Sequence, residues 1–136
     1  MPFYLLLFSF IFLCACSPQA NAPLKNTYWS LSELRGENIV KVEHQPTIHL
    51  IFHINDASLQ GSDGCNRFQG EYLQNGTTFS FKKLNSTRIS CTEERTQSAD
   101  FMQVLHQTDR IQIKGDQLIL FSADIEIARF EGKEDY

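Results

Sequence analysis

Residues 68–84, FQGEYLQNGTTFSFKKL, carry the clearest folding signal in the chain. Two strand-like segments, 68–73 and 77–84, flank the dipeptide Asn75-Gly76. Asn-Gly between two such segments is the strongest short-range signal for a β-hairpin, because both residues accept the positive φ of a tight turn. We therefore predict a hairpin here and a β-rich fold around it.

Segments before and after this hairpin also have strand patterns. In segment 48–54 every second residue is apolar, which predicts one buried face. The residues of that face are Ile48, Leu50, Phe52 and Ile54. We expect 57–60 to return as its partner, and further strands at 27–34, 39–42, 111–113, 118–121 and 125–130. In the last of these, Ile125, Ile127 and Arg129 are expected to share a face.

One helix is predicted, late in the chain. Ser90-Cys91-Thr92-Glu93 has the spacing of a capping box, so a helix should run from about 92 to 107. Its apolar stripe consists of Phe101 and Leu105, with Met102 and Val104 nearby. The predicted fold class is mainly β (a β-rich α+β fold), with an antiparallel, barrel-like sheet of about eight short strands and this one helix.

The N-terminus has the pattern of a bacterial lipoprotein signal. Residues 1–15 contain no charged side chain, and Leu13 and Ala15 precede Cys16 as in a lipobox. We expect cleavage after Ala15, lipid on Cys16 and a tether at 16–25. Cys14 is the weaker lipidation candidate, because bulky residues precede it. An uncleaved anchor is the other alternative, although the run is short for a membrane span.

Composition limits the remaining part to one small domain. The chain has 136 residues and a formal net charge of −4. This charge argues against nucleic-acid binding, which needs a clustered basic face. Cys65 and Cys91 remain as an even pair in an exported protein, so a disulfide is expected. Two buried thiols that never meet are the alternative.

Several segments together resemble the META domain family, which includes HslJ-like heat-shock proteins. The matching residues are 28–31 (YWSL), 64–68 (GCNRF), Gly70, Tyr72, 87–91 (TRISC), Phe101, Leu105 and 118–120 (LIL). The resemblance implies a domain at 26–131, followed by a polar tail at 132–136. It also implies a Gram-negative envelope lipoprotein, in a family linked to heat induction and novobiocin tolerance without an established biochemical activity. Family members commonly have a glycine in the last hairpin, where this chain has 122–125 (SADI), so we expect a looser turn.

Some residues could carry chemistry, but each has a plainer structural interpretation. Gly64-Cys65-Asn66 could form a nucleophile turn, yet Gly and Asn are also the residues that tight turns require. Arg88, next to Thr87, could bind an anion near the helix N-terminus or hydrogen-bond within the fold. Together with Trp29, we interpret Gly64, Asn66, Thr87 and Arg88 as a structural motif.

The histidines give only a weak metal signal. His49 and His53 are expected on one strand face, but zinc usually needs three or four protein ligands, and nothing pairs His44 with them. His106 lies near the helix end, where a cation is favoured. No metal ion or cofactor is therefore expected.

The sequence contains no Gly-x-Ser-x-Gly elbow, phosphate loop or His-Glu-x-x-His motif, so we expect no enzymatic activity. The predicted function is a monomeric, non-catalytic lipoprotein on the outer membrane, facing the periplasm. It would support envelope integrity or stress tolerance through binding or structural contacts with an envelope protein. The alternative is a binding module for a small apolar ligand in the barrel, or an inhibitor-like binder of a secreted hydrolase.

Overall fold

The computed structural model describes residues 15–41, 43–91 and 96–133. Its strands are β1 (Tyr28–Leu34), β2 (Glu37–Asn38), β3 (His49–Phe52), β4 (Ser58–Ser62), β5 (Arg67–Asn75), β6 (Thr78–Ser86), β7 (Arg110–Lys114), β8 (Gln117–Ser122) and β9 (Ile125–Lys133). Helix α1 (Thr96–Gln107) lies between β6 and β7.

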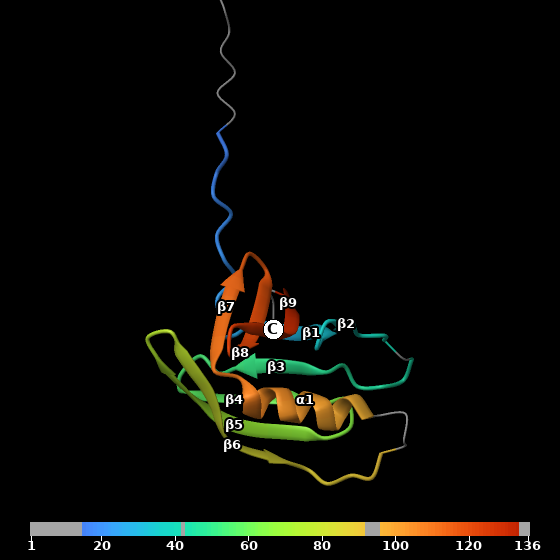
Figure 1. Cartoon of the computed structure of the whole chain (residues 1–136). Helices are drawn as coiled ribbons and strands as arrows, with labels where there is room; N and C mark the ends of the chain where they lie inside the picture. The colour runs from blue at the N-terminus through green and yellow to red at the C-terminus, as the bar shows by residue number, and fades with distance from the viewer. Residues whose placement is uncertain (1–14, 42, 92–95, 134–136) are drawn as a thin grey trace, which may run out of the picture.

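The strands form one antiparallel sheet that curls into a half-barrel (Figure 1). The strand order is β6-β5-β4-β3-β1-β9-β8-β7, and β2 pairs with β1. The two edges approach each other where the amide of Phe79 donates to the carbonyl of Asp109 over 2.9 Å. The predicted fold class is confirmed, and β5 and β6 form the predicted hairpin with register Asn75↔Thr78.

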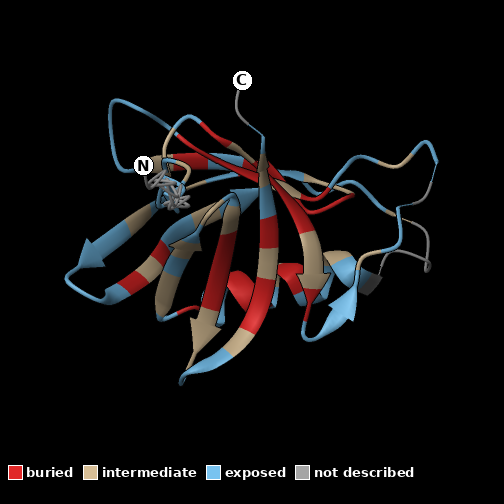
Figure 2. Ribbon diagram, turned by 90° about the horizontal axis from the view of Figure 1, so that it is seen from above, coloured by how far each residue is buried: buried red, intermediate tan, exposed pale blue. Residues whose placement is uncertain are grey.

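Aromatic side chains fill the interior of the half-barrel. Buried positions run across the sheet in bands (Figure 2). The fully buried aromatic residues are Trp29, Phe52, Phe68, Phe79, Phe101 and Phe130. Edge-to-face contacts join several of these rings, as between Phe52 and Phe79 with centroids 6.3 Å apart. Such rings combine large apolar burial with directional packing, so they contribute much of the stability of this core.

Helix α1 closes the core beside β6. Phe101, Val104 and Leu105 have no exposed surface, so the predicted apolar stripe is confirmed. The described part of the helix runs from Thr96 to Gln107, and Cys91 is not helical; the predicted start, at about residue 92, lies outside the described residues. The second half of the proposed capping box, Thr92 and Glu93, lies outside the described residues.

Two strand predictions were wrong at their ends. Ile54 is 63% exposed, because β3 ends at Phe52 and the chain then turns around Asp56. No strand is present at 39–41, and residue 42 is not described. The short strand of this region is β2, which ends at Asn38, directly before the predicted segment. In both places an apolar run extends beyond the hydrogen-bonded ladder.

The last hairpin also differs from its predictions. A register shift between Leu120 and Phe121 buries Ile127 and Ala128 together, so Ile125 and Arg129 do not share a buried face with Ile127. Ile125 itself is 67% exposed. The expected alternation fails because a bulge adds one residue to one strand.

The β8–β9 turn is tight and not loose. Ala123 and Asp124 both have positive φ, 48° and 64°, which is the conformation that usually selects glycine or asparagine. The amide of Ala123 donates to Oδ2 of Asp109 over 2.8 Å, and Arg110 lies 3.6 Å from Asp124. These contacts hold the turn closed without a glycine.

Candidate functional site

Asp63 organises the turn between β4 and β5 at the mouth of the half-barrel. It is 4% exposed, and its Oδ1 accepts the amides of Cys65 (2.8 Å) and Asn66 (2.5 Å). Gly64 adopts φ +88°, and a Cβ there would lie 3.1 Å from Cγ1 of Ile48. The turn therefore requires glycine at position 64 both for its backbone and for its contact with the core.

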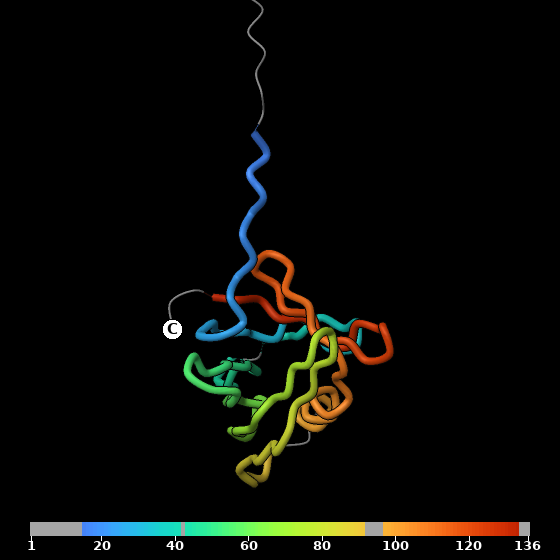
Figure 3. The backbone as a smooth tube through the Cα atoms, turned by 90° about the vertical axis from the view of Figure 1, so that its left-hand side faces the viewer, coloured from blue at the N-terminus to red at the C-terminus, as the bar shows by residue number. Residues whose placement is uncertain are grey.

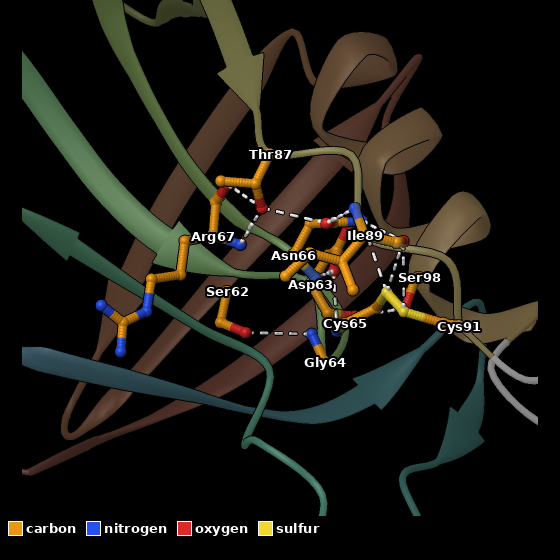
Figure 4. The surroundings of a disulfide bond; sticks show 10 residues. All are labelled: Ser62, Asp63, Gly64, Cys65, Asn66, Arg67, Thr87, Ile89, Cys91 and Ser98. Atoms are coloured by element: carbon orange, nitrogen blue, oxygen red, sulfur yellow. Dashed lines mark hydrogen bonds between the residues drawn. A yellow bond between two sulfur atoms is a disulfide. The ribbon is translucent and has the colours of Figure 1, made fainter.

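Asn66 connects this turn to the segment after β6. Its Oδ1 accepts the amide of Ile89 (2.7 Å) and the hydroxyl of Thr87 (2.9 Å). The backbone amide of Thr87 in turn donates to the carbonyl of Arg67 over 2.9 Å. Figure 4 shows these bonds converging beside the two sulfur atoms. Asn66 and Thr87 thus hold two segments about twenty residues apart in sequence.

A disulfide joins Cys65 to Cys91, with the two Cα atoms 6.1 Å apart. This is the pairing expected from the sequence. The hydroxyl of Ser98 in α1 also donates to the carbonyl of Asp63 over 2.7 Å. We call residues 63–66 with Thr87, Ile89, Cys91 and Ser98 the disulfide hub. It fixes the sheet, the 87–91 segment and the first turn of α1 to one another.

A hollow of about 190 Å³ opens beside the hub. Leu31 and Ile48 form its apolar floor, and its rim includes Lys41 and Gln97. Val40, also at this rim, is 73% exposed. The hollow combines an apolar floor with polar rim groups, which is the usual character of a small-ligand site, although it is smaller than most.

Other residues predicted to belong to the site have separate surroundings. Trp29 is fully buried, and its Nε1 donates to the carbonyl of Leu24 over 2.9 Å, so it packs in the core and holds the start of the domain. Arg88 is exposed next to the hub. Within the described residues its side chain makes no hydrogen bond or ion pair, so neither of its expected roles is visible there.

The histidines do not converge. His49 points outward from β3, stacks on Tyr28 with ring centroids 4.6 Å apart, and has Nδ1 2.9 Å from the carbonyl of Thr47. His53 lies beyond the end of β3, and His106 is exposed in the last turn of α1. In the described ranges no group of three potential metal ligands comes together.

Cys16 is an exposed free cysteine, on an extended segment that leaves the domain (Figures 1 and 3). Contacts with the domain start at Asn21, earlier than the expected boundary at 26. The Asn21 side chain accepts the amide of Gly115, and the amide of Ala22 donates to the carbonyl of Gly115, both over 2.8 Å. Of the predicted signal peptide 1–15, residues 1–14 lie outside the described residues. Among those described, no helix is long and apolar enough to cross a membrane.

Sequence reasoning missed the outer face of β3, β4 and β5. Three shallow hollows of about 270 to 370 Å³ lie on this face or beside it, and Arg67 lines all three. Strand alternation places His49 opposite the apolar face of its strand, and it could have placed Arg67 and Gln69 outside the core in the same way. It could not have shown that the surface between them is concave.

These features define a class of protein: an antiparallel half-barrel with one late helix and a disulfide at its mouth. A family model of the META domain matches residues 22–135. The chain therefore belongs to the META domain family, as the sequence resemblance implied.

Solved structures share the fold. A protein from Burkholderia xenovorans, solved by NMR, is 23% identical with a TM-score of 0.64, and the match covers 88% of this chain and 97% of that one. A second NMR structure is 21% identical with a TM-score of 0.62, covering 79% and 91%. A DUF4847 family protein from Bacteroides vulgatus is 14% identical with a TM-score of 0.54, covering 82% and 94%. No curated protein matches the chain.

Proposed function

We propose that this META domain protein is a non-catalytic lipoprotein of the cell envelope, held by lipid on Cys16 at the outer membrane and facing the periplasm. The observation that carries the proposal is the exposed position of Cys16 on an extended segment outside the domain. A thiol in that position is accessible to a lipid-transferring enzyme. The lipobox residues Leu13 and Ala15 precede it directly.

The domain itself is suited to binding or structural contacts. The disulfide between Cys65 and Cys91 fits an oxidising compartment such as the periplasm. Shifted pKa values often mark catalytic groups, but those seen here belong to an exposed carboxylate, Asp56, and a half-buried guanidinium, Arg129, which lie outside the hollows described above. Hydrogen bonds from Ser58 lower the pKa of Asp56, and the hydrogen bonds and charge of Glu126 raise that of Arg129. We propose that the domain supports envelope integrity and tolerance of heat and novobiocin through contacts with an envelope partner.

Metabolic palmitate labelling tests the anchor. Wild type and Cys14→Ala should be labelled, and Cys16→Ala should not. Equal labelling of all three proteins would refute lipidation at Cys16, and loss in Cys14→Ala alone would move the site to Cys14.

A deletion strain tests the role in the envelope. It should be more sensitive than its parent to heat, novobiocin and detergent. The wild-type gene should restore tolerance, and the Cys16→Ala gene should not if anchoring is required. Unchanged tolerance in the deletion strain would contradict the proposed role.

A second candidate function is binding of a defined target in the hollow of about 190 Å³ beside the disulfide hub. The barrel interior is filled by aromatic side chains, so a small ligand or an inhibited hydrolase would have to engage this hollow and the exposed Val40. A pull-down with the full chain should then recover one stoichiometric partner that Val40→Lys loses. Leu73→Lys, at another exposed apolar residue, is the matched control. Retention of the partner by Val40→Lys would exclude the hollow.

A further inference from the structure

The outer face of β3, β4 and β5 has a chemistry distinct from the rest of the sheet. Inward positions on these strands, such as Leu50, Leu59 and Phe68, are buried in the core. The alternate positions form cross-strand rows, because His49 pairs with Ser62 and Ser62 with Arg67. Ser62 is only 5% exposed and its hydroxyl accepts the amide of Gly64, so this row presents the imidazole of His49 and the guanidinium of Arg67 on either side of a buried serine.

A second row continues from β4 and β5 onto β6 and consists of amides. Gln60 pairs with Gln69, and Gln69 pairs with Asn85, so three adjacent strands each present one amide side chain. Each amide both donates and accepts hydrogen bonds. A row of this kind matches a ligand with many hydroxyl groups, because a hydroxyl also does both.

Arg67 gives the face an unpaired positive charge. In the described residues its guanidinium has no hydrogen bond or ion pair, and Figure 4 shows it extending away from the disulfide hub. By contrast, Arg35, Arg110 and Arg129 each lie within 4 Å of a carboxylate. An arginine fork is suited to bidentate binding of a carboxylate.

The hollows on this face converge on the same arginine. One, of about 340 Å³, lies among His49, Gln60 and Arg67. Another, of about 270 Å³, adds Tyr28, whose ring stacks on His49. The third, of about 370 Å³, extends to Asn85. Together the hollows form a shallow concave surface across neighbouring strands, with amides, an aromatic pair and one cation. A strand face of the OB-fold barrel is likewise used to bind oligosaccharides.

We propose that this face binds an acidic glycan, with a carboxylate of the sugar chain on Arg67 and hydroxyl groups on the amide row. Charge complementarity selects this occupant. A nucleic acid would need several clustered cations, and an apolar partner would meet an amide row. The proposal does not depend on the lipid anchor.

Titration calorimetry of the full chain in detergent, with alginate oligomers as the acidic glycan, tests the proposal. Arg67→Gln should weaken binding by about tenfold or more, since a charged hydrogen bond is lost. Arg67→Lys should bind less tightly than wild type but better than Arg67→Gln, because the charge remains while the fork is lost. Gln69→Ala should weaken binding less than Arg67→Gln does. Lys114→Gln, which removes an equal charge from β7, should bind like wild type.

Three further probes test whether binding needs both the sugar and its acidic groups, and which glycan supplies them. Dextran, a neutral glycan, and polyglutamate, an acidic chain without sugars, should both bind more weakly than alginate. Sedimentation with isolated peptidoglycan sacculi distinguishes the sources: co-sedimentation that Arg67→Gln abolishes assigns peptidoglycan, and alginate binding alone assigns a free acidic polysaccharide. Equal binding of polyglutamate or dextran would overturn the proposal. So would failure of both alginate and sacculi to bind, or unchanged alginate binding by Arg67→Gln with its fold intact by circular dichroism.

Discussion

The hydroxyl of Thr87 donates a hydrogen bond to Oδ1 of Asn66 over 2.9 Å, and this contact joins two strand ends 21 residues apart. The same oxygen accepts the amide of Ile89 over 2.7 Å. One amide side chain therefore holds the segment that leads to Cys91. The disulfide therefore joins two segments that these hydrogen bonds already hold together.

Asn66→Ala should lower the free energy of unfolding by about 1–3 kcal/mol, because it leaves the hydroxyl of Thr87 and the amide of Ile89 without their acceptor. Urea denaturation would measure the loss. Gln74→Ala, at an exposed residue of β5, is the control and should be nearly neutral. Equal stability of the two variants would show that water replaces Asn66 at no cost.

Cys65→Ser/Cys91→Ser should lower the stability by about 3–4 kcal/mol, since the disulfide closes a loop with a sequence separation of 26. The loss should appear as a lower urea midpoint relative to the oxidised wild type. Reduction of the wild type should reproduce it. Peptide mass spectrometry under non-reducing conditions provides the covalent check, and two free thiols in protein isolated from the envelope would contradict the pairing.

The sequence predicted those parts of the fold in which local signals and packing agree. Asn75-Gly76 lies between the two longest strands that precede α1, and the stripe of Phe101 and Leu105 faces the core. The predictions failed at Ile54, which lies beyond the end of the β3 ladder, and at Ile125, where a bulge breaks the alternation with the buried Ile127. Strand ends depend on the turns that cap them, and alternation alone does not locate those turns.

The candidate sites were predicted less completely. The cysteine count was enough to predict the disulfide, and turn chemistry singled out Gly64 and Asn66. The bulge that buries Ile127 with Ala128 and the concave surface around Arg67 both depend on pairing between distant strands. Such registers are set by the whole sheet, so no local pattern contains them.

Leu105→Ala should cost about 2–5 kcal/mol, because Leu105 is fully buried where α1 closes the half-barrel. Thermal and urea unfolding would both report the loss. His106→Ala, one residue further along α1 and exposed, is the matched control and should change stability little. A neutral Leu105→Ala would mean that α1 does not pack on the core in solution.

Ser58→Ala should raise the pKa of Asp56. The hydroxyl of Ser58 donates to Oδ1 of Asp56, and the Ser58 amide donates to the same oxygen over 2.9 Å. These two bonds, the hydroxyl first, hold the pKa of Asp56 below its ordinary value of 3.8. Because the pKa is depressed in the folded state, ionised Asp56 stabilises the fold above pH 3.8, and this contribution is lost as the pH falls through the lower, folded-state value.

An NMR titration that follows the side-chain carboxyl carbon of Asp56 would measure this shift. In Ser58→Ala the midpoint should move up towards 3.8, because the ionised form has lost its strongest donor. The remaining amide bond should keep it from returning completely. Ser80→Ala removes a hydroxyl from β6 and should leave the Asp56 midpoint unchanged. An unchanged midpoint in Ser58→Ala would mean that the hydroxyl bond does not form in solution and that the backbone alone caps the turn after β3.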